Sequence, residues 1–479
     1  MAAMPATASS ERLPQRLRLS SRALAHAVAP RTWSDAAKVA HADATLAVGV
    51  RVGIAVAVVM VVAGLAGYPN LAGFAALGAL VSAFARYEPY PRLGWKVGII
   101  GVGVVVFVAA GAGLGLLGVP ASVEIGLMGI ACGVAVLLVG VYRVTGPGPV
   151  VMIFAATAAV GSSGSVAALA GIVLASAVGT VVGWLAAMAP WVLYPMGPAR
   201  LATARALAAL ARVERGASDE DVAAAVRAVD AARDVVAASG SRHRAYGERL
   251  ETLLDDVAVL LDRWSHEPDD RRRAHLASHE AELRRLKSRT ELSGFVGTTH
   301  QLSPRFGFLR DHAPRWRSRE LLLAAVRSTI AALVAGWLAL GVGLDHPLWA
   351  SMGAMAALQG IDFTHTVHRA IQRLAGNIVG ALLAAGLIGA QLGFWPTVAV
   401  VVVLQAVAEI VVLRNYALTS VAVTAMALLL TGFGAHITPD VAISRVADTL
   451  VGVVVGVVAA ALTISRSDRI TRSHSRIGM

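Results

Sequence analysis

The chain has 479 residues, of which 56% are hydrophobic and only 15% are charged. A soluble domain carries about 25% charged residues, and the apolar residues here come in blocks of membrane-crossing length, so an ordinary soluble protein is excluded. The formal net charge of +12 lies between and beside these blocks, where loop orientation in a membrane explains it better than nucleic acid binding. The sequence therefore predicts an all-α integral membrane protein.

The N-terminal part, residues 1–43, holds several arginines and no early apolar core. It is predicted to be a basic cytoplasmic segment without a cleaved signal peptide. Within it, residues 11–28 have the composition of a basic amphipathic segment that lies on an anionic leaflet. A disordered tail is the alternative.

The next part, residues 44–195, is predicted to be a first transmembrane region of six helices. Prolines at 190, 195 and 198 then interrupt the apolar pattern. The predicted crossings are 44–67, 71–85, 97–117, 122–141, 149–164 and 166–189.

Residues 196–317 differ in kind, because they are rich in alanine, arginine and acidic residues. Leucine and valine recur there at helical spacing, and Ser218 is a plausible N-cap followed by acidic residues in the first turn. We expect a helical domain outside the membrane.

The apolar blocks resume in residues 318–466, which are predicted to form a second transmembrane region. Residues 467–479 are predicted to be a basic cytoplasmic tail. The six crossings of this second region are predicted at 321–343, 348–361, 373–393, 395–413, 416–434 and 446–465.

Lysine and arginine occur in one set of predicted loops and are absent from the other. The positive-inside rule then places both termini and the central domain in the cytoplasm. The only ambiguous cation is Arg445, beside the last of the outer loops. The inner loops contain Arg86, Arg92, Lys96, Arg143, Arg369, Arg373 and Arg414.

The two membrane regions are predicted to be an internal duplication. Residues 178–187 (VGTVVGWLAA) align with 451–460 (VGVVVGVVAA), and an even number of crossings per copy makes the repeats parallel. The predicted fold is thus two parallel six-helix repeats flanking a cytoplasmic helical domain. Glycine pairs four residues apart are expected to let helices approach closely. These pairs are Gly179 with Gly183, Gly376 with Gly380, and Gly452 with Gly456.

Each predicted repeat contains one apolar segment that is too short for a relaxed crossing, at 71–85 and 348–361. Matched short segments in two halves point to a transport site, because irregular backbone at membrane depth must line a cavity or be buried. The alternative is a short helix that only packs.

Arg51 and Arg327 occupy matching positions in the first helix of each half. Each lies about seven residues inside, or roughly 10 Å at 1.5 Å per residue. Charged groups inside a crossing are costly and usually mark a pathway, and a guanidinium matches a carboxylate. Snorkelling to the headgroups is the alternative.

Three further charged groups lie in crossings of the second half. Glu409, on one helical face with Gln405, is a candidate proton-coupling carboxylate or a partly solvated residue at a helix end. Asp448 is a second coupling candidate, although an ion pair with Arg445 across one turn is the simpler interpretation. Asn377 is expected to bond a neighbouring helix.

The segment HPLWASMGAMAALQG (346–360), followed by HRAIQRLAGNIVGALLA (368–384), resembles the fusaric acid resistance–like family of membrane transporters. The resemblance covers 321–465 and is looser over 44–190, where Tyr68-Pro69-Asn70 stands in place of His346-Pro347. It implies efflux of aromatic carboxylic acids, and a fold similar to that of plant aluminium-activated malate transporters, which are anion channels.

The function expected from these features is secondary export of small, aromatic carboxylates from a bacterial cytoplasm across the inner membrane. Arg51, Arg327, Trp349 and Gln359 are the candidate substrate-binding residues, and Glu409 and Asp448 are the candidates for coupling. The expected partners are the organic anion and the lipid bilayer, with an oligomer or an accessory protein left open. No enzyme activity, cofactor, metal or nucleic acid is expected. An anion channel and a non-transporting scaffold with a cytoplasmic docking domain are the alternatives.

Overall fold

The computed structural model describes residues 25, 27, 29–38, 46–85, 88–213, 218–239, 244–264, 270–285, 308–360, 363–412, 414–433 and 440–463. Within these ranges every regular element is an α-helix or a 3-10 helix, which confirms the all-α prediction. Eight of the described helices are long and apolar enough to cross a membrane. The chain is therefore a multi-pass membrane protein.

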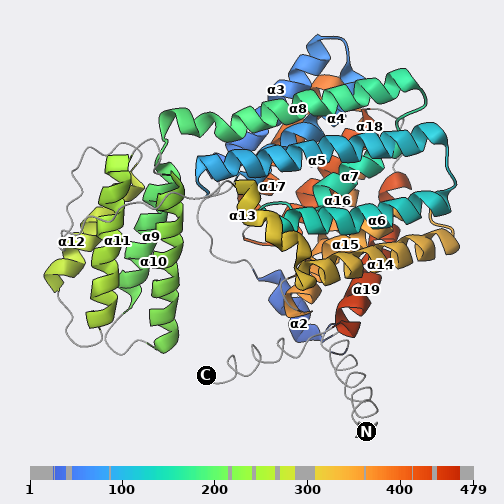
Figure 1. Ribbon diagram of the computed structural model, residues 1–479. Helices are drawn as coiled ribbons and strands as arrows, with labels where there is room; N and C mark the ends of the chain where they lie inside the picture. The colour runs from blue at the N-terminus through green and yellow to red at the C-terminus, as the bar shows by residue number, and fades with distance from the viewer. Residues whose placement is uncertain are drawn as a thin grey trace, which may run out of the picture. The chain divides into compact units, whose positions relative to one another are not determined.

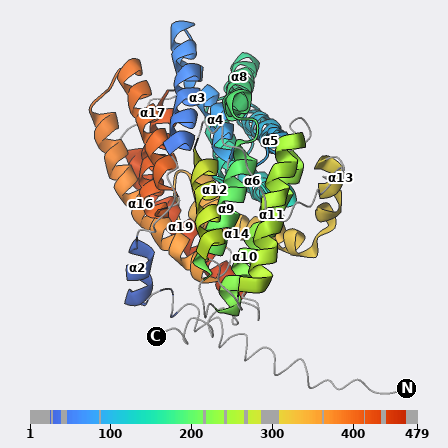
Figure 2. The same cartoon turned by 90° about the vertical axis from the view of Figure 1, so that its left-hand side faces the viewer.

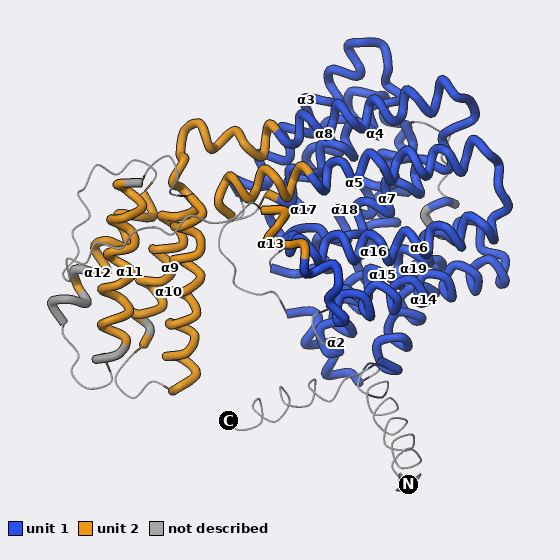
Figure 3. Tube along the Cα trace, in the orientation of Figure 1, with its two compact units in different colours: residues 1–84, 99–184, 314–479 blue, residues 85–98, 185–313 orange. Residues whose placement is uncertain are grey.

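The chain forms two compact units (Figure 3). Unit 1 comprises residues 1–84, 99–184 and 314–479, and unit 2 comprises residues 85–98 and 185–313.

The helices of the two membrane halves follow one another in chain order (Figure 1). The first half consists of α3 (Leu46–Leu65), η2 (Pro69–Leu71), α4 (Ala72–Ala79), η3 (Leu80–Phe84), α5 (Tyr90–Leu117), α6 (Ala121–Val141), α7 (Val150–Val160) and α8 (Val166–Leu193). The second half consists of α14 (Arg319–Gly341), α15 (Pro347–Ala357), α16 (Phe363–Gly389), α17 (Phe394–Val411), α18 (Tyr416–Gly432) and α19 (Asp440–Leu462).

Three short helices of unit 1, α4, α7 and α15, lie in its interior. Helices α7 and α15 have 11 residues each, about half of what a ~30 Å hydrocarbon core requires. All residues of α4 and all but the first of α15 are buried, and α4 contacts α7 and α18 while α15 contacts α7 (Figure 1). Helices without lipid contact do not have to match the bilayer thickness, which explains their length.

The long helices expose large apolar side chains instead. Val102 of α5 is 65% exposed, Leu174 of α8 is 65% exposed and Leu382 of α16 is 70% exposed. Such contiguous apolar surface is stable against lipid rather than water. The prediction of twelve crossings thus corresponds to eight helices of spanning length and four shorter ones, and the twelve-crossing repeat arrangement stays a prediction.

Glycines bring the second and sixth helices of each half together. A Cβ added to Gly179 or Gly183 of α8 would collide with carbonyl oxygens of α4, and a Cβ at Gly452 or Gly456 of α19 would collide with backbone atoms of α15. The predicted packing role of these glycines is confirmed.

The third and fifth helices of each half approach one another in the same manner. Gly111 and Gly115 of α5 lie against carbonyl oxygens of α7, and Gly376 and Gly380 of α16 lie against those of α18. Between the halves, α3 packs on α17 and α14 packs on α6. The first helix of each half therefore contacts the fourth helix of the other.

Unit 2 is built around four helices with a common apolar core. Its largest fully buried side chains are leucines of α9 and α11, among them Leu207, Leu250 and Leu254. Arg92 Nη1 bonds Asp234 Oδ2 at 2.6 Å within this unit. The four helices are α9 (Gly197–Arg212), α10 (Asp219–Ser239), α11 (Arg244–Trp264) and α12 (Asp270–Arg284), and α13 (Phe308–His312) follows them.

The start of α10 is capped as predicted. The backbone N–H of Asp221 donates to Ser218 Oγ at 3.3 Å, and Ser218 Oγ donates to Asp221 Oδ2 at 2.7 Å. Hydrogen bonds from the Ser218 side chain and backbone hold the pKa of Asp221 below its ordinary value. This reciprocal pair is a form of capping box.

The N-terminal region is described mainly through α2 (Pro30–Ala37), which lies against α16 in unit 1. Most of the predicted basic segment at 11–28 lies outside the described residues, as does the predicted tail at 467–479.

Candidate functional site

A buried arginine lies on a tryptophan of α15, one of the short interior helices. Arg445 of α19 is 4% exposed and Trp349 of α15 is 9% exposed. The guanidinium carbon of Arg445 is 4.3 Å from the centre of the Trp349 ring and 5.9 Å from that of Phe154 in α7. These are cation–π distances. The cation of the second half therefore meets aromatic rings from both halves.

The guanidinium of Arg445 keeps unused hydrogen-bond donors. Its Nε and Nη1 atoms are buried and make no hydrogen bond within the described part of the chain. Burying donors without acceptors is costly, and more so for a charged group. A carboxylate bound beside the arginine would satisfy these donors with charge-assisted bonds. The guanidinium thus keeps donors that an anion could accept from.

Asp448 lies one turn further along α19 and is fully buried. Neither of its carboxylate oxygens has a hydrogen-bond partner of good geometry among the described residues. In the part of the chain that the structure describes, Asp448 and Arg445 form no salt bridge, so the simple ion pair suggested by their spacing is not formed. The carboxyl group is well placed to respond to the charge of an anion or a proton nearby.

His346 extends the cluster by stacking on the Trp349 ring. The two rings are stacked, with centroids 4.6 Å apart and an interplanar angle of 15°, and His346 Nδ1 lies 3.2 Å from Ser444 Oγ. Burial lowers the pKa of His346 and the charge of Arg445 lowers it further, while Asp345 opposes both. The imidazole is therefore neutral at neutral pH and fixes the plane of Trp349.

A second group of cations lies on α16. Arg373 is 7% exposed, and its Nη1 donates to the Tyr416 hydroxyl at 3.2 Å. Arg369, one turn earlier, lies with its guanidinium carbon 4.1 Å from the centre of the Tyr416 ring. The charge of Arg373 also acts on Arg445. Arg369, Arg373 and Arg445 thus form a succession of cations leading to the Trp349 cluster.

The next turn of α16 is tied to α18 by an amide. Thr424 Oγ1 donates to Asn377 Oδ1 at 2.6 Å, and Asn377 Nδ2 donates to the carbonyl of Arg373 at 3.1 Å. The prediction that Asn377 bonds a neighbouring helix is confirmed. These bonds fix the part of α16 that carries Arg373.

Arg51 and Arg327 lie away from this cluster. Arg51 is half-buried, and its Nη2 donates to the Ser82 carbonyl in η3 at 3.4 Å. Arg327 is also half-buried, and its Nη1 donates to Thr463 Oγ1, after the end of α19, at 3.4 Å. Each arginine thus contacts another segment of its own half, and neither is among the side chains described around Arg445.

Gln359 and Glu409 occupy two further places. The side-chain oxygen of Gln359 lies against Gly148, whose φ of +82° and tight surroundings favour glycine, and Gln359 Nε2 is buried without a hydrogen-bond partner in the described chain. Glu409 is 5% exposed and accepts from Gln405 Nε2 at 3.3 Å. It lies on the face of α17 that packs on α3 near Gly49.

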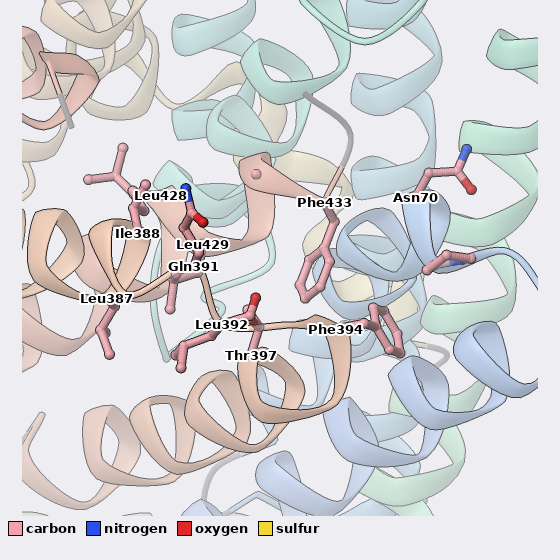
Figure 4. A pocket seen from close by; sticks show the side chains of 12 residues that line it. Asn70, Leu387, Ile388, Gln391, Leu392, Phe394, Thr397, Leu428, Leu429 and Phe433 are labelled. Carbon is pink, nitrogen blue, oxygen red and sulfur yellow. The ribbon is translucent and has the colours of Figure 1, made fainter. Parts of the chain in front are cut away.

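A pocket of ≈ 410 Å³ opens where α16 and α18 end and α17 begins (Figure 4). The rings of Phe394 and Phe433 lie 5.3 Å apart at one side of it, and Asn70 and Gln391 supply amide groups. No charged side chain is among the described residues that line it. It suits an uncharged apolar group, and it shares no lining residue with the Arg445 cluster.

Of the predicted site residues, Trp349 and Asp448 belong to the cluster, whereas Arg51, Arg327, Gln359 and Glu409 lie elsewhere. Sequence reasoning did not single out Arg445, His346 or Arg373 as site residues. No signal in the sequence indicated the burial of Arg445, because the last crossing was predicted to begin at 446, whereas α19 begins at Asp440. Among the described residues, no group of three or more His, Cys, Asp or Glu side chains is placed to hold a metal ion.

Comparison with known proteins identifies the second half. Residues 330–459 match the family model described as fusaric acid resistance protein-like. This segment is therefore similar to fusaric acid resistance proteins. It contains all of α15, α16, α17 and α18 and most of α14 and α19, and hence Trp349, Arg373 and Arg445. The family resemblance predicted over 321–465 is confirmed for residues 330–459, and the looser resemblance over 44–190 stays a prediction.

A curated relative adds to this identification. The chain is 34% identical over 165 residues to the uncharacterized membrane protein YvaC of Bacillus subtilis (strain 168). The match covers 33% of this chain and 25% of that protein, so the chain spans about a quarter of the length of the relative it matches. No solved structure matches the chain.

Proposed function

We propose that this fusaric acid resistance protein-like membrane protein is a secondary transporter that exports small aromatic carboxylates. The observation that supports this substrate class most directly is Arg445, buried against Trp349 with unused donors. A guanidinium binds the carboxylate, and the aromatic walls of Trp349 and Phe154 accept the ring.

The proposed architecture is two parallel six-helix repeats, with the central helical unit and both termini in the cytoplasm. The matched glycine contacts of the second with the sixth helix, and of the third with the fifth, support the duplication. The distribution of lysine and arginine over the loops supports the orientation in a bacterial inner membrane.

The proposed roles of the side chains follow from their places along the helices. Arg51 and Arg327 attract the anion at the cytoplasmic end, where Gln359 also lies in this topology. The anion then binds between Arg445 and Trp349. An inside-negative potential assists its exit by about 2.3 kcal/mol per charge per 100 mV. Asp448, beside the bound anion, is proposed to carry a coupled proton, with Glu409 as the second candidate.

Efflux from proteoliposomes tests this proposal. Vesicles containing the purified protein are loaded with labelled benzoate, and release is followed with and without an inward proton gradient. We expect saturable release that the gradient accelerates, and we expect Asp448→Asn to abolish the acceleration. If Glu409→Gln abolishes it instead, the coupling role belongs to Glu409.

The same vesicles distinguish the competing functions. Currents that follow the anion gradient and ignore the proton gradient would replace the transporter by an anion channel. The scaffold hypothesis would be supported if the vesicles release neither aromatic nor aliphatic carboxylates and a partner protein binds unit 2. Arg51→Ala with Arg327→Ala is expected to lower release severalfold, and unchanged release would remove both residues from the route.

A further inference from the structure

Two short segments that precede the membrane halves have similar sequences. Residues 29–34 read APRTWS and residues 313–318 read APRWRS. The first belongs to α2, and the second precedes α14, with residues 314–317 in a 3-10 helix. We call α2 the first strap and residues 314–318 the second strap.

The first strap is bound by side chains of the second half. Asn415, in the turn between α17 and α18, donates its Nδ2 to the carbonyls of Ala36, Ala37 and Lys38 at 3.3, 3.4 and 3.1 Å. Gln372 of α16 donates to the Ala36 carbonyl as well, at 2.7 Å. The C-terminal carbonyls of α2 are therefore held by the half that follows in sequence. Figures 1 and 2 show α2 beside the start of α16.

The second strap is bound to the first half. Arg315 donates from Nε to the carbonyl of Val141 at 2.9 Å and from Nη2 to that of Gly140 at 3.0 Å. These are the last carbonyls of α6, and the Trp316 ring packs edge-on against Tyr142 in the following turn. Each strap thus contacts the turn between the fourth and fifth helices of the half that it does not lead into.

Both straps expose a tryptophan beside cations. Trp33 is 46% exposed and Trp316 is 41% exposed. Arg31 is exposed on the first strap, where Lys38 follows and pairs with Asp35 at 2.7 Å, and Arg317 is exposed on the second, with Arg319 following. Tryptophan and basic residues next to the ends of membrane helices are typical of the headgroup region, where the ring enters the interface and the cation meets lipid phosphate.

We propose that the two straps form a matched pair of binding surfaces for anionic lipid headgroups. The occupant is a phosphate-bearing lipid surface rather than a protein, because each exposed ring lies within two residues of an exposed arginine and adjoins a helix of spanning length. Because each strap is clamped to the opposite half, lipid bound at a strap anchors that half's inner turn. The placement of both straps on the cytoplasmic leaflet rests on the proposed topology, whereas the lipid contact of each strap does not.

Fluorescent labels on the full-length protein in nanodiscs test the proposal. The single native cysteine, Cys132, is buried, so labels attach selectively at Ser34→Cys and Ser318→Cys. Phosphatidylcholine discs, with and without phosphatidylglycerol, contain a lipid brominated near its carbonyl end. We expect phosphatidylglycerol to increase quenching at both positions at least twofold. Trp33→Ala is expected to reverse the increase at 34, and Trp316→Ala the increase at 318.

The control label sits at Gly164→Cys, in the turn between α7 and α8. A Cβ there meets no other atom, and residues 161–166 contain no cation, so its quenching should not depend on phosphatidylglycerol. The proposal is overturned if the labels at 34 and 318 respond like this control. It is also overturned if they are shielded from both the brominated lipid and aqueous iodide, which would show a protein cover. Loss of transport alone does not affect this readout.

Discussion

The two membrane halves, residues 46–193 and 319–462, have similar contacts between their helices but bury different polar side chains. Apart from Lys96, which pairs with Glu88 in unit 2, the buried polar side chains among the described residues of the first half are hydroxyls: Ser82, Thr157, Ser163 and Ser176. The second half buries ionisable side chains as well, namely Arg373, Glu409, Arg445 and Asp448. The helix packing is therefore similar in the two halves, whereas the buried ionisable side chains are concentrated in the second half.

The matched glycine contacts align the helices of one half with those of the other, residue by residue. Counting back from Gly179 and Gly452, Ile172 of α8 stands where Arg445 stands in α19. By the same register, Phe74 of α4 corresponds to Trp349 of α15. The first half thus presents an apolar version of the cluster. The contacts that hold the helices together are shared, whereas the arginine and tryptophan of the cluster occur at these positions in the second half.

The largest loss of stability is expected from substitutions at the glycines that pack the helices in both halves. Gly179→Val and Gly452→Val each place side-chain atoms against backbone of the neighbouring helix, where overpacking costs about 1–3 kcal/mol or more. We expect both variants to lose most of their monodisperse protein in detergent, measured by size-exclusion chromatography. Gly126→Ala and Gly386→Ala, where a Cβ meets nothing, should behave like the wild type. If only one of the two valine variants loses monodisperse protein, the glycine contacts of the two halves are not equivalent.

The next largest effect is expected on efflux, from substitutions at the aromatic position that differs between the halves. Trp349→Leu removes the ring under Arg445, and a desolvated cation–π contact is worth about 2 kcal/mol. Since 1.4 kcal/mol is a factor of ten, benzoate efflux from proteoliposomes should fall about tenfold or more. Phe74→Leu, at the corresponding position of the first half, should lower efflux less than about threefold. Equal losses of efflux in the two variants would contradict a site that lies mainly in the second half.

Side-chain hydrogen bonds between helices should matter about equally in both halves. Thr424→Val removes the bond to Asn377, and Ser163→Ala removes the 2.6 Å bond from Ser163 Oγ to the Ala112 carbonyl. Interhelical hydrogen bonds in membranes are worth about 0.6–1.7 kcal/mol. Each variant should therefore lower the thermal unfolding midpoint by a few degrees, and a large loss at only one of them would contradict shared packing.

The smallest effect lies outside the membrane, at the start of α10. Because hydrogen bonds to Ser218 hold the pKa of Asp221 below its ordinary value of 3.8, their stabilisation is complete above that value and is lost as the pH falls through the lower folded-state pKa. Ser218→Ala should slightly lower the unfolding midpoint of the helical unit at pH 7. The difference from the wild type, followed by circular dichroism, should become smaller in strong acid, where only the cap bond from Asp221 N–H to Ser218 Oγ remains. A difference that does not change with pH would show that the Asp221 carboxylate contributes nothing.

Much of the fold was predictable because it depends on local composition. Long apolar blocks such as 166–189 give helices of spanning length, and the short blocks at 71–85 and 348–361 give short helices, since both follow from the number of consecutive apolar residues. Ser218 was predictable as a cap for the same reason. That the short helices lie together inside was not predictable, because it depends on contacts between distant segments.

The candidate site was less predictable. Arg445 lies beside a predicted loop, and nothing near it in sequence indicates burial. Its aromatic neighbours, Trp349 and Phe154, come from two other helices, one of them in the other half. Arg51 and Arg327 attracted attention because their positions repeat, yet repetition reports duplicated architecture, whereas the Arg445 cluster exists once in the described chain.

Equilibrium binding of labelled benzoate to the protein in nanodiscs tests most directly whether the Arg445 cluster is the anion site. Three proteins are compared: the wild type, Arg445→Gln, and Arg319→Gln, which loses the same charge at an exposed position. We predict saturable binding that Arg445→Gln weakens at least tenfold and that Arg319→Gln leaves unchanged. Binding to a correctly folded Arg445→Gln variant with wild-type affinity would contradict the account.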